Sequence, residues 1–297
     1  MVVHEPVLRD EVVSALVAAR GGTFVDCTVG LGGHARALLE AGATRLIGID
    51  RDRESLSIAR DALRGWGDRV DLVHADFREI DRVLDWLGID LVSGIVSDLG
   101  MSSYQLEAEG RGFSFQREAP LDMRMDRSTG RTLGDLLDAV SEEQLANVIF
   151  RYGEERHSRR IARAIVEARR GGRLSTTSHL AETVRRAIPR RAQAARLDPA
   201  TRTFQALRIW TNDELSGLDD YLAASCRRLE EGGRLAVIAF HSLEDRVVKH
   251  TFRRLSADPA ARMVVVTRRP VTASEDELER NPRSRSAKLR VIERVAA

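Results

Sequence analysis

Glycines that follow a short apolar run are the first residues of this chain whose spacing indicates chemistry. The run Thr23-Phe-Val-Asp-Cys-Thr leads into Val29-Gly-Leu-Gly-Gly-His, and a helix-like segment then ends at Gly42. Glycine lets the backbone pass close to a ligand, and the N-terminus of a helix offers unpaired N–H groups. The turn Gly30-x-Gly32-Gly33 therefore predicts a pocket for an adenosine-containing cofactor.

Acids and one aromatic residue end the predicted strands around this turn. Asp50 ends the second strand twenty residues after Gly30, where a carboxylate can accept hydrogen bonds from both ribose hydroxyls. Asp26 precedes the turn and can approach the amino group of a methionine moiety. Phe77 follows the third strand and can flank a purine, or can be a plain core residue. Asp98 ends the fourth strand, where open α/β sheets bind ligands, and can hold the N–H of a base amine.

The glycine turn alone leaves the cofactor open. Gly30-x-Gly32-x-x-Ala35 also satisfies the dinucleotide fingerprint. Asp26 and the strand end Ala75-Asp-Phe favour S-adenosylmethionine instead. Two alternatives therefore stand beside a methyltransferase, namely an NAD-dependent oxidoreductase and a non-catalytic RNA-binding assembly factor that keeps the fold.

The elements that must position these residues alternate between strand and helix. Strand patterns begin near residues 23, 45, 70 and 94 and resume near 235, 263 and 289, with helix-length segments between most of them. This alternation predicts a mostly parallel sheet that is covered on both faces. Residues 101–214 contain helix patterns and no convincing strand. We therefore predict a helical domain over 106–214, inserted between the fourth and fifth strands of an α/β domain over 1–105 and 215–297. A polar loop is predicted over residues 272–285.

Composition narrows the class of protein. The chain has 297 residues, of which 43% are hydrophobic and 31% charged, which is typical of a globular protein. Cys27 and Cys226 are its two cysteines, so a disulfide framework and a cysteine zinc site are excluded, and no metal site is predicted. No segment has the length and apolarity of a membrane span or a secretion signal. We expect a cytoplasmic protein with no membrane partner.

The positive charge is concentrated in the predicted insertion. Residues 151–208 hold 15 arginines against 5 acids, which favours an anionic partner. The candidate phosphate contacts are Arg159, Arg160, Arg190 and Arg191, with Arg283, Arg285 and Lys288 as additions. Arginines and aromatics of a polar loop, Arg111, Phe113, Phe115 and Arg117, either stack on splayed bases or anchor the loop. His241 and Ser242 follow the fifth strand and either reach the target base or form a polar hinge.

Several longer motifs occur in an order that resembles one family. They are Val-Gly-Leu-Gly-Gly-His, Ser-Asp-Leu-Gly-Met-Ser-Ser, Arg-Gly-Phe-Ser-Phe, Tyr-Gly-Glu-Glu-Arg, Phe-His-Ser-Leu-Glu-Asp-Arg and Asn-Pro-Arg-Ser-Arg-Ser. In these residues the chain resembles, from end to end, the bacterial 16S ribosomal RNA cytosine-N4 methyltransferases of the RsmH (MraW) family. Tyr104 departs from that pattern, because a proline is common at this position.

The resemblance implies a Rossmann-like, class I S-adenosylmethionine-dependent methyltransferase. The implied reaction is methylation of a cytosine N4 in the decoding (P-site) region of 16S ribosomal RNA, with the small ribosomal subunit as partner. The implied cofactor residues are Gly32, Gly33, His34, Asp50, Phe77, Asp98 and Gln105. Asp98 is also the candidate catalytic residue. The oligomeric state is left open, with a homodimer as one option.

Overall fold

The computed structural model describes residues 5–17, 20–189 and 198–296. It divides the chain into two compact units. Unit 1 consists of Met1–Gly100 and Leu215–Ala297, and unit 2 of Met101–Glu214. The sequence placed the first boundary at residue 105, five residues later. The structure places it directly after β4 (Val92–Asp98), where the chain leaves the sheet.

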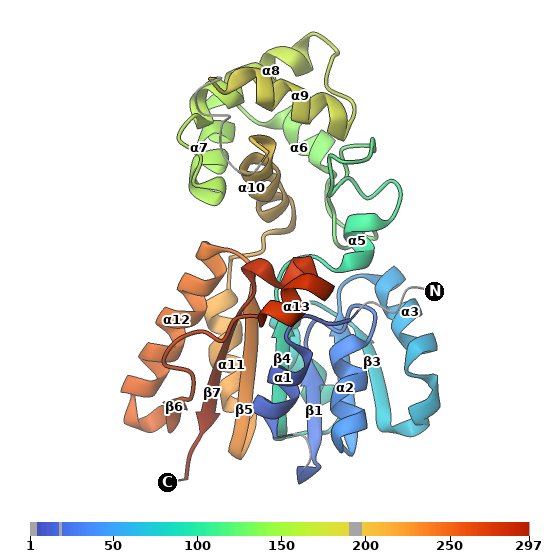
Figure 1. Ribbon diagram of the computed structural model, residues 1–297, viewed down its shortest axis with the longest axis vertical. Coiled ribbons are helices and arrows are strands. Elements are labelled where there is room, and N and C mark those ends of the chain that lie inside the picture. The colour runs from blue at the N-terminus through green and yellow to red at the C-terminus, as the bar shows by residue number, and fades with distance from the viewer. Residues whose placement is uncertain (1–4, 18–19, 190–197, 297) are drawn as a thin grey trace. The chain divides into compact units, whose positions relative to one another are not determined.

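Unit 1 is built on a single seven-stranded sheet (Figure 1). The strands are β1 (Thr23–Asp26), β2 (Arg45–Asp50), β3 (Val70–His74), β4, β5 (Leu229–Ala239), β6 (Met263–Val265) and β7 (Lys288–Arg294). Their order is β3-β2-β1-β4-β5-β7-β6, and β7 is antiparallel to both of its neighbours. The remaining pairs are parallel. This arrangement confirms the predicted Rossmann-like α/β fold.

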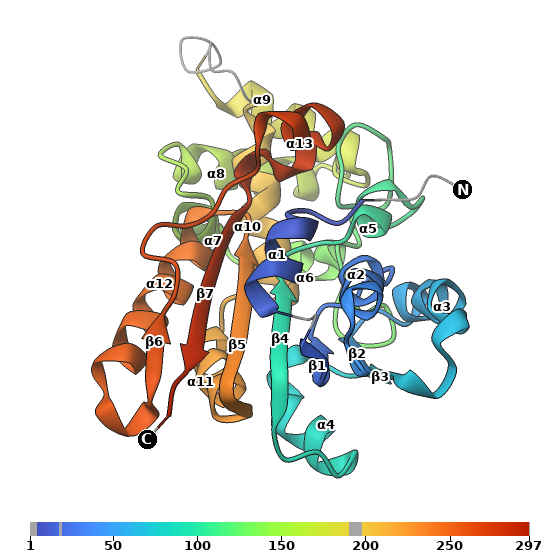
Figure 2. The same cartoon turned by 60° about the horizontal axis from the view of Figure 1, so that its bottom comes forward.

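Helices cover both faces of the sheet, as Figures 1 and 2 show. One face carries α1 (Arg9–Leu16), α2 (Gly33–Ala41) and α3 (Arg53–Ala62), and the other carries α4 (Ile80–Trp86), α11 (Leu218–Arg227) and α12 (Ser242–Ala257). Strand side chains alternate between the two apolar cores, so Val25 faces α4 and α11 while Phe24 faces α1 and α2. Because parallel strands are buried on both faces, their sequences are nearly continuous apolar runs.

Short elements complete unit 1. They are the 3₁₀ turns Arg64–Arg69, Phe77–Glu79, Pro259–Ala261 and Pro282–Ser286 and the helix α13 (Glu275–Arg280). The last two elements contradict the predicted loop over 272–285. Ser274 caps α13 by accepting a hydrogen bond from the Glu277 N–H, and the Glu277 Oε1 accepts one from the backbone N–H of Leu8 at 2.8 Å. This contact between the two ends of the chain stabilises a helix that local sequence does not predict.

Unit 2 is helical and has an apolar core of its own. Its helices are α5 (Ser103–Glu107), α6 (Leu133–Ala139), α7 (Glu142–Gly153), α8 (Ser158–Arg170), α9 (Thr177–Ala187) and α10 (Ala200–Asn212). Leu145, Ile161, Leu180 and Phe204, from α7 to α10, are buried together. Within the described part of unit 2, extended pairing is limited to an isolated bridge between Pro120 and Thr176. No helix among the described residues is both long and apolar enough to cross a membrane.

Candidate functional site

The glycine turn between β1 and α2 has the backbone that its sequence predicts. Gly30 and Gly32 have φ angles of 50° and 87°, a region that side-chain-bearing residues rarely occupy. Gly32 is the N-cap of α2 and has no side chain with which to cap the helix, and its own N–H donates to the Val29 carbonyl oxygen at 2.7 Å. The start of α2 therefore lacks a side-chain cap at Gly32, and the positive end of the helix dipole there favours a ligand that brings acceptor groups.

Asp50 ties the glycine turn to the end of β2. Its Oδ2 accepts a hydrogen bond from the Gly30 N–H and its Oδ1 from the Asp52 N–H, each at 2.8 Å. Burial raises the pKa of Asp50 to about 6, against the lowering effect of these two N–H groups. Each carboxylate oxygen retains a second lone pair. Asp50 can therefore accept ligand hydroxyls while it fixes the turn.

Asp26 and Asp98 end the two neighbouring central strands. Asp26 lies opposite Val96 in the β1–β4 register, so Asp98 reaches two residues further toward the carboxyl edge. The Asp98 N–H donates to Thr28 Oγ1 at 2.7 Å, and the Thr28 N–H donates to Asp26 Oδ1 at 3.2 Å. Thr28 thus links the two acids. Sequence reasoning did not single it out, although the local pattern Asp-Cys-Thr contained it.

Both acids have unusual electrostatic surroundings. Burial raises the pKa of Asp26 to about 7, with a further contribution from Asp50. Burial, together with Asp26 and Glu244, raises the pKa of Asp98 well above its ordinary value. Asp26 Oδ2 and Asp98 Oδ1 are buried and have no hydrogen-bond partner among the described residues. Orphaned carboxylate oxygens of this kind suit a ligand that carries positive charge or N–H groups.

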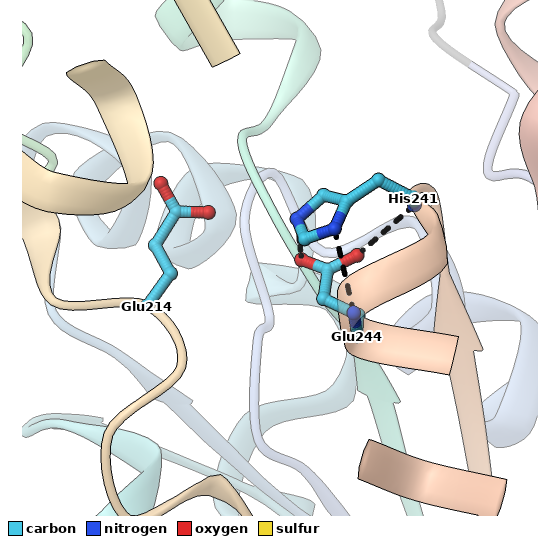
Figure 3. Close-up of side chains that lie close together, drawn as sticks. All are labelled: Glu214, His241 and Glu244. Atoms are coloured by element: carbon cyan, nitrogen blue, oxygen red, sulfur yellow. Dashed lines mark hydrogen bonds and ion pairs between the residues drawn. The ribbon is translucent and has the colours of Figure 1, made fainter. Parts of the chain in front are cut away.

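His241 is the N-cap of α12, shortly after β5 ends at Ala239, and it pairs with Glu244 (Figure 3). The Glu244 N–H donates to the His241 ring, and the ring Nε2 lies 3.1 Å from Glu244 Oε1. Glu244 Oε2 in turn accepts from the Phe240 N–H at 2.9 Å. Figure 3 also draws Glu214, which belongs to unit 2 and forms an ion pair there with Arg208 at 2.8 Å. The His241 ring is therefore part of a helix cap.

The rings of His34 and Phe77, two of the predicted cofactor residues of unit 1, have contacts within the protein. The His34 ring is buried, and its Nε2 lies 2.9 Å from the carbonyl oxygen of Val7. Burial lowers the His34 pKa to about 4, so this ring is neutral at pH 7. Phe77 is half-buried and packs edge-on against Tyr221, with 4.6 Å between ring centroids. One face of Phe77 thus belongs to the core beneath the strand ends.

Gln105 lies in unit 2, on α5. Its side chain accepts from the Ser102 N–H at 3.0 Å, and its own N–H donates to Ser102 Oγ at 3.2 Å. This reciprocal pair is a capping box, which fixes the start of the helix. The predicted contact of Gln105 with the cofactor stays a prediction.

Of the two alternatives for the loop around Arg111, the structure favours anchoring. Arg111 is 1% exposed, and its guanidinium donates to the carbonyl oxygens of Arg124 and Met125. Phe113 is buried as well, and Phe115 packs against Phe204 at 4.9 Å. The contacts of both rings inside unit 2 therefore favour the anchoring alternative, and base stacking by the half-buried Phe115 stays a prediction.

The predicted phosphate contacts differ in their surroundings. Arg159 and Arg160 are exposed on α8, whereas Arg190 and Arg191 lie outside the described residues. Lys288 lies 3.4 Å from Asp245, which also pairs with Arg290. Lys288 therefore has a partner inside unit 1. Of the predicted phosphate contacts, the exposed Arg159 and Arg160 remain the best candidates.

The strand order, the uncapped glycine turn and the carboxylates at the strand ends define an S-adenosylmethionine-dependent methyltransferase. Residues 1–295 match the model of the MraW methylase family, and the chain belongs to that family. The dinucleotide interpretation of the glycine turn is thereby set aside.

Relatives match over nearly the whole chain. A ribosomal RNA small subunit methyltransferase H from Geotalea uraniireducens is 48% identical over 98% of both chains. Its counterpart from Sorangium cellulosum is 51% identical over 98% of this chain and 91% of its own length. Among solved structures, an rRNA methylase from Streptococcus thermophilus covers 95% of both chains with a TM-score of 0.42 and 12% identity.

Proposed function

We propose that this enzyme methylates the exocyclic N4 of a cytosine in the decoding (P-site) region of 16S ribosomal RNA. The family and the names of the relatives support a small-subunit ribosomal RNA substrate. The observation that carries the N4 assignment is Asp98, whose buried Oδ1 has no partner in the described chain. Such an atom fits a substrate group that brings its own N–H.

The chemistry of cytosine explains why an acceptor is needed. The N4 lone pair is delocalised into the ring, so the amine is a weak nucleophile. Asp98 Oδ1 accepts one N–H of the amine, orients it and favours the build-up of positive charge on N4. When bound, S-adenosylmethionine supplies an electrophilic methyl group. The proton that N4 loses passes to Asp98 or to water.

The residues of unit 1 divide the binding of the cofactor among them. Gly32 lets the cofactor approach the backbone closely, because its N–H is donated to Val29 and it has no side chain, and Gly33 offers its N–H at the start of α2. Asp50 accepts the ribose hydroxyls and Asp26 faces the ammonium group. Phe77 flanks the adenine with the face that Tyr221 leaves open. For His34 we propose that the backbone makes the contact, because the ring is held by Val7. Gln105 completes the proposed set from α5.

Unit 2 is the proposed RNA-recognition domain. A cytosine N4 is inaccessible inside a stacked duplex, so the target base must be unpaired or flipped out. Arginines of unit 2 then bind phosphates around it and fix its register. Binding to small subunits should therefore weaken steeply with salt. We also propose that the enzyme acts in the cytoplasm, where a small-subunit substrate is found.

Labelled S-adenosylmethionine and small subunits that lack the modification test this proposal. After incubation, nuclease digestion and mass spectrometry locate the added methyl group. A methyl group on a cytosine N4 of the decoding region supports the proposal, and one on carbon 5 or on another base contradicts it. Cofactor binding without transfer to subunits or to free 16S RNA favours the non-catalytic assembly factor.

A further inference from the structure

An exposed aromatic ring lies on α7 among arginines of unit 2. Phe150 is 61% exposed, while Leu145 and Ile149 on the same helix are buried. A single exposed apolar side chain is common on protein surfaces and means little by itself. The exposed arginines near Phe150 are the reason to consider it as a binding residue.

Several arginines of unit 2 form ion pairs with acids. Arg163 pairs with Glu142, Arg185 with Asp198 and Arg186 with Glu182. Around Phe150 the pattern is different. Five exposed arginines there have no ion pair with an acid among the described residues, and they are Arg151, Arg156, Arg159, Arg160 and Arg202.

The helices that carry these residues lie side by side, and Figures 1 and 2 both show α7 beside α8 and α10. The chain turns sharply at Glu154, which has a φ of 49°, and Glu155 closes the turn by accepting from the His157 N–H at 2.8 Å. Gly153 is packed so closely on α10 that a Cβ would lie 2.6 Å from the Arg202 carbonyl oxygen. Gln205 adds a hydrogen bond to the Tyr152 carbonyl at 3.1 Å.

We call the surface formed by Phe150, Arg151, Arg156, Arg159, Arg160 and Arg202 the corner patch. The Arg151 guanidinium lies over the Tyr152 ring, 5.5 Å from its centroid, which holds this planar group close to the protein surface. The acids of the stretch 150–160 are Glu154, which is exposed, and Glu155, which is buried. The patch is therefore positive, with an apolar ring at its edge.

We propose that the corner patch binds an unpaired nucleotide of ribosomal RNA, with its base stacked on Phe150 and the adjoining phosphates on the arginines. This inference rests on the proposed function and names a contact outside the cofactor residues. Aromatic rings bind bases through their faces without regard to sequence, and arginine binds phosphate in a bidentate manner. A protein partner would need five suitably placed acids to neutralise these five arginines. An RNA strand neutralises them readily, because every nucleotide carries one negative charge.

Phe150→Ala tests the stacking contact. Because the ring is exposed, the melting temperature should stay within about 2 °C. The KM for small subunits should rise about tenfold or more with kcat nearly unchanged, since stacking contributes to binding and not to chemistry. Phe150→Tyr should restore the KM to near the original value. Trp86→Ala removes an aromatic ring that is 74% exposed in unit 1. It serves as the control and should change neither the KM for small subunits nor kcat.

A direct binding measurement separates this inference from the proposed function. Fluorescence anisotropy with a labelled single-stranded 16S fragment does not depend on methyl transfer, and Phe150→Ala should lower its affinity about tenfold. Replacing Arg159 and Arg160 by alanine should reduce the log–log slope of affinity against salt by about 0.7 for each phosphate that the variant no longer neutralises. Unchanged binding of the fragment by Phe150→Ala overturns the inference. A weakening that appears with intact subunits and not with free 16S RNA also overturns it, because the partner would then be a ribosomal protein.

Discussion

Asp26 and Asp98 end adjacent parallel strands, and each holds one buried carboxylate oxygen without a partner in the described chain. Thr28 connects the two acids through one hydrogen bond to each. Burial raises the pKa of both acids, and a neighbouring carboxylate adds to it, namely Asp50 for Asp26 and both Asp26 and Glu244 for Asp98. A ligand that brings positive charge would stabilise the ionised form of both carboxyl groups, so the free enzyme favours such a ligand.

Asp98→Asn should separate catalysis from stability. The amide keeps the shape and loses the charge, so methyl transfer should slow by about 10²–10³-fold in kcat. The melting temperature should hold or rise, because the unfavourable proximity of Asp98 to Asp26 and Glu244 is removed. Asp90→Asn is the matched control, since the Asp90 side chain is 95% exposed. A kcat within twofold of the original would contradict the proposed role of Asp98 in methyl transfer.

Asp50→Asn should weaken cofactor binding and leave the chemical step largely intact. A charged acceptor contributes about 1.5–3 kcal/mol to each hydrogen bond it makes, so the Kd should rise by about 10- to 100-fold. Isothermal titration calorimetry measures this change directly. Asp71→Asn, at a half-exposed ion pair with Arg45, provides the control within the same sheet. Equal Kd values for the two variants would argue against a ribose contact at Asp50.

The backbone of the glycine turn predicts a difference between two glycine substitutions. Gly32→Ala forces a side chain into φ 87° and places its Cβ 3.2 Å from buried Leu63. Gly88→Ala also meets a positive φ, of 68°, but has open space around it. Each should lose about 1–2 kcal/mol of stability from the backbone alone. Gly32→Ala should lose more, and it alone should impair S-adenosylmethionine binding, as thermal melts with and without the cofactor would measure.

Cofactor affinity should depend on pH through Asp26. Its pKa in the free enzyme is about 7, raised from 3.8, so the carboxyl is mostly protonated below neutrality. Binding of an ammonium group favours the ionised form, so affinity should fall as the pH drops below 7, by about tenfold per pH unit for one coupled proton. Calorimetry from about pH 5.5 to 8, in buffers of different ionisation enthalpy, measures the released proton. Asp26→Asn should bind more weakly at about pH 8 and show a flatter profile.

The same shift makes the free protein respond to pH in the opposite sense. A raised folded pKa gives a stabilising contribution that is complete below about pH 4 and is lost as the pH rises through about 7. The melting temperature of the free enzyme should therefore decline over this window relative to that of Asp26→Asn. A saturating cofactor should abolish the decline.

The sheet and the glycine turn could be predicted because their signals are local. Strand, glycine turn and helix follow one another within about twenty residues, and the acids stand at strand ends that parallel pairing brings to one edge. Gly30, Gly32 and Asp50 could therefore be placed from their spacing. The hydrogen bond from the Gly30 N–H to Asp50 joins them as that spacing requires.

Residues whose roles depend on distant partners could not be predicted. In sequence, Arg111 and Phe113 are compatible both with an RNA-binding loop and with an anchored one. Their roles become clear only in the structure, where Arg111 donates to the carbonyl oxygens of Arg124 and Met125 and Phe113 is buried. The helix α13 depends on Leu8, which is 269 positions away from Glu277. His241 occupies a helix-capping position where serine, threonine, asparagine or aspartate is usual, so its cap with Glu244 had no familiar signature.

The insertion of unit 2 between β4 and β5 also sets an order for synthesis on the ribosome. When β4 emerges, its neighbour β5 is still separated from it by the whole of unit 2. The continuous segment Met101–Glu214 has its own apolar core and can fold first. During that time β3, β2, β1 and β4 have no partner for the outer edge of β4. The edge of β4, the strand that ends in Asp98, therefore stays unpaired and prone to aggregation until β5 has been synthesised. The need for chaperones should be greatest while unit 2 is being translated.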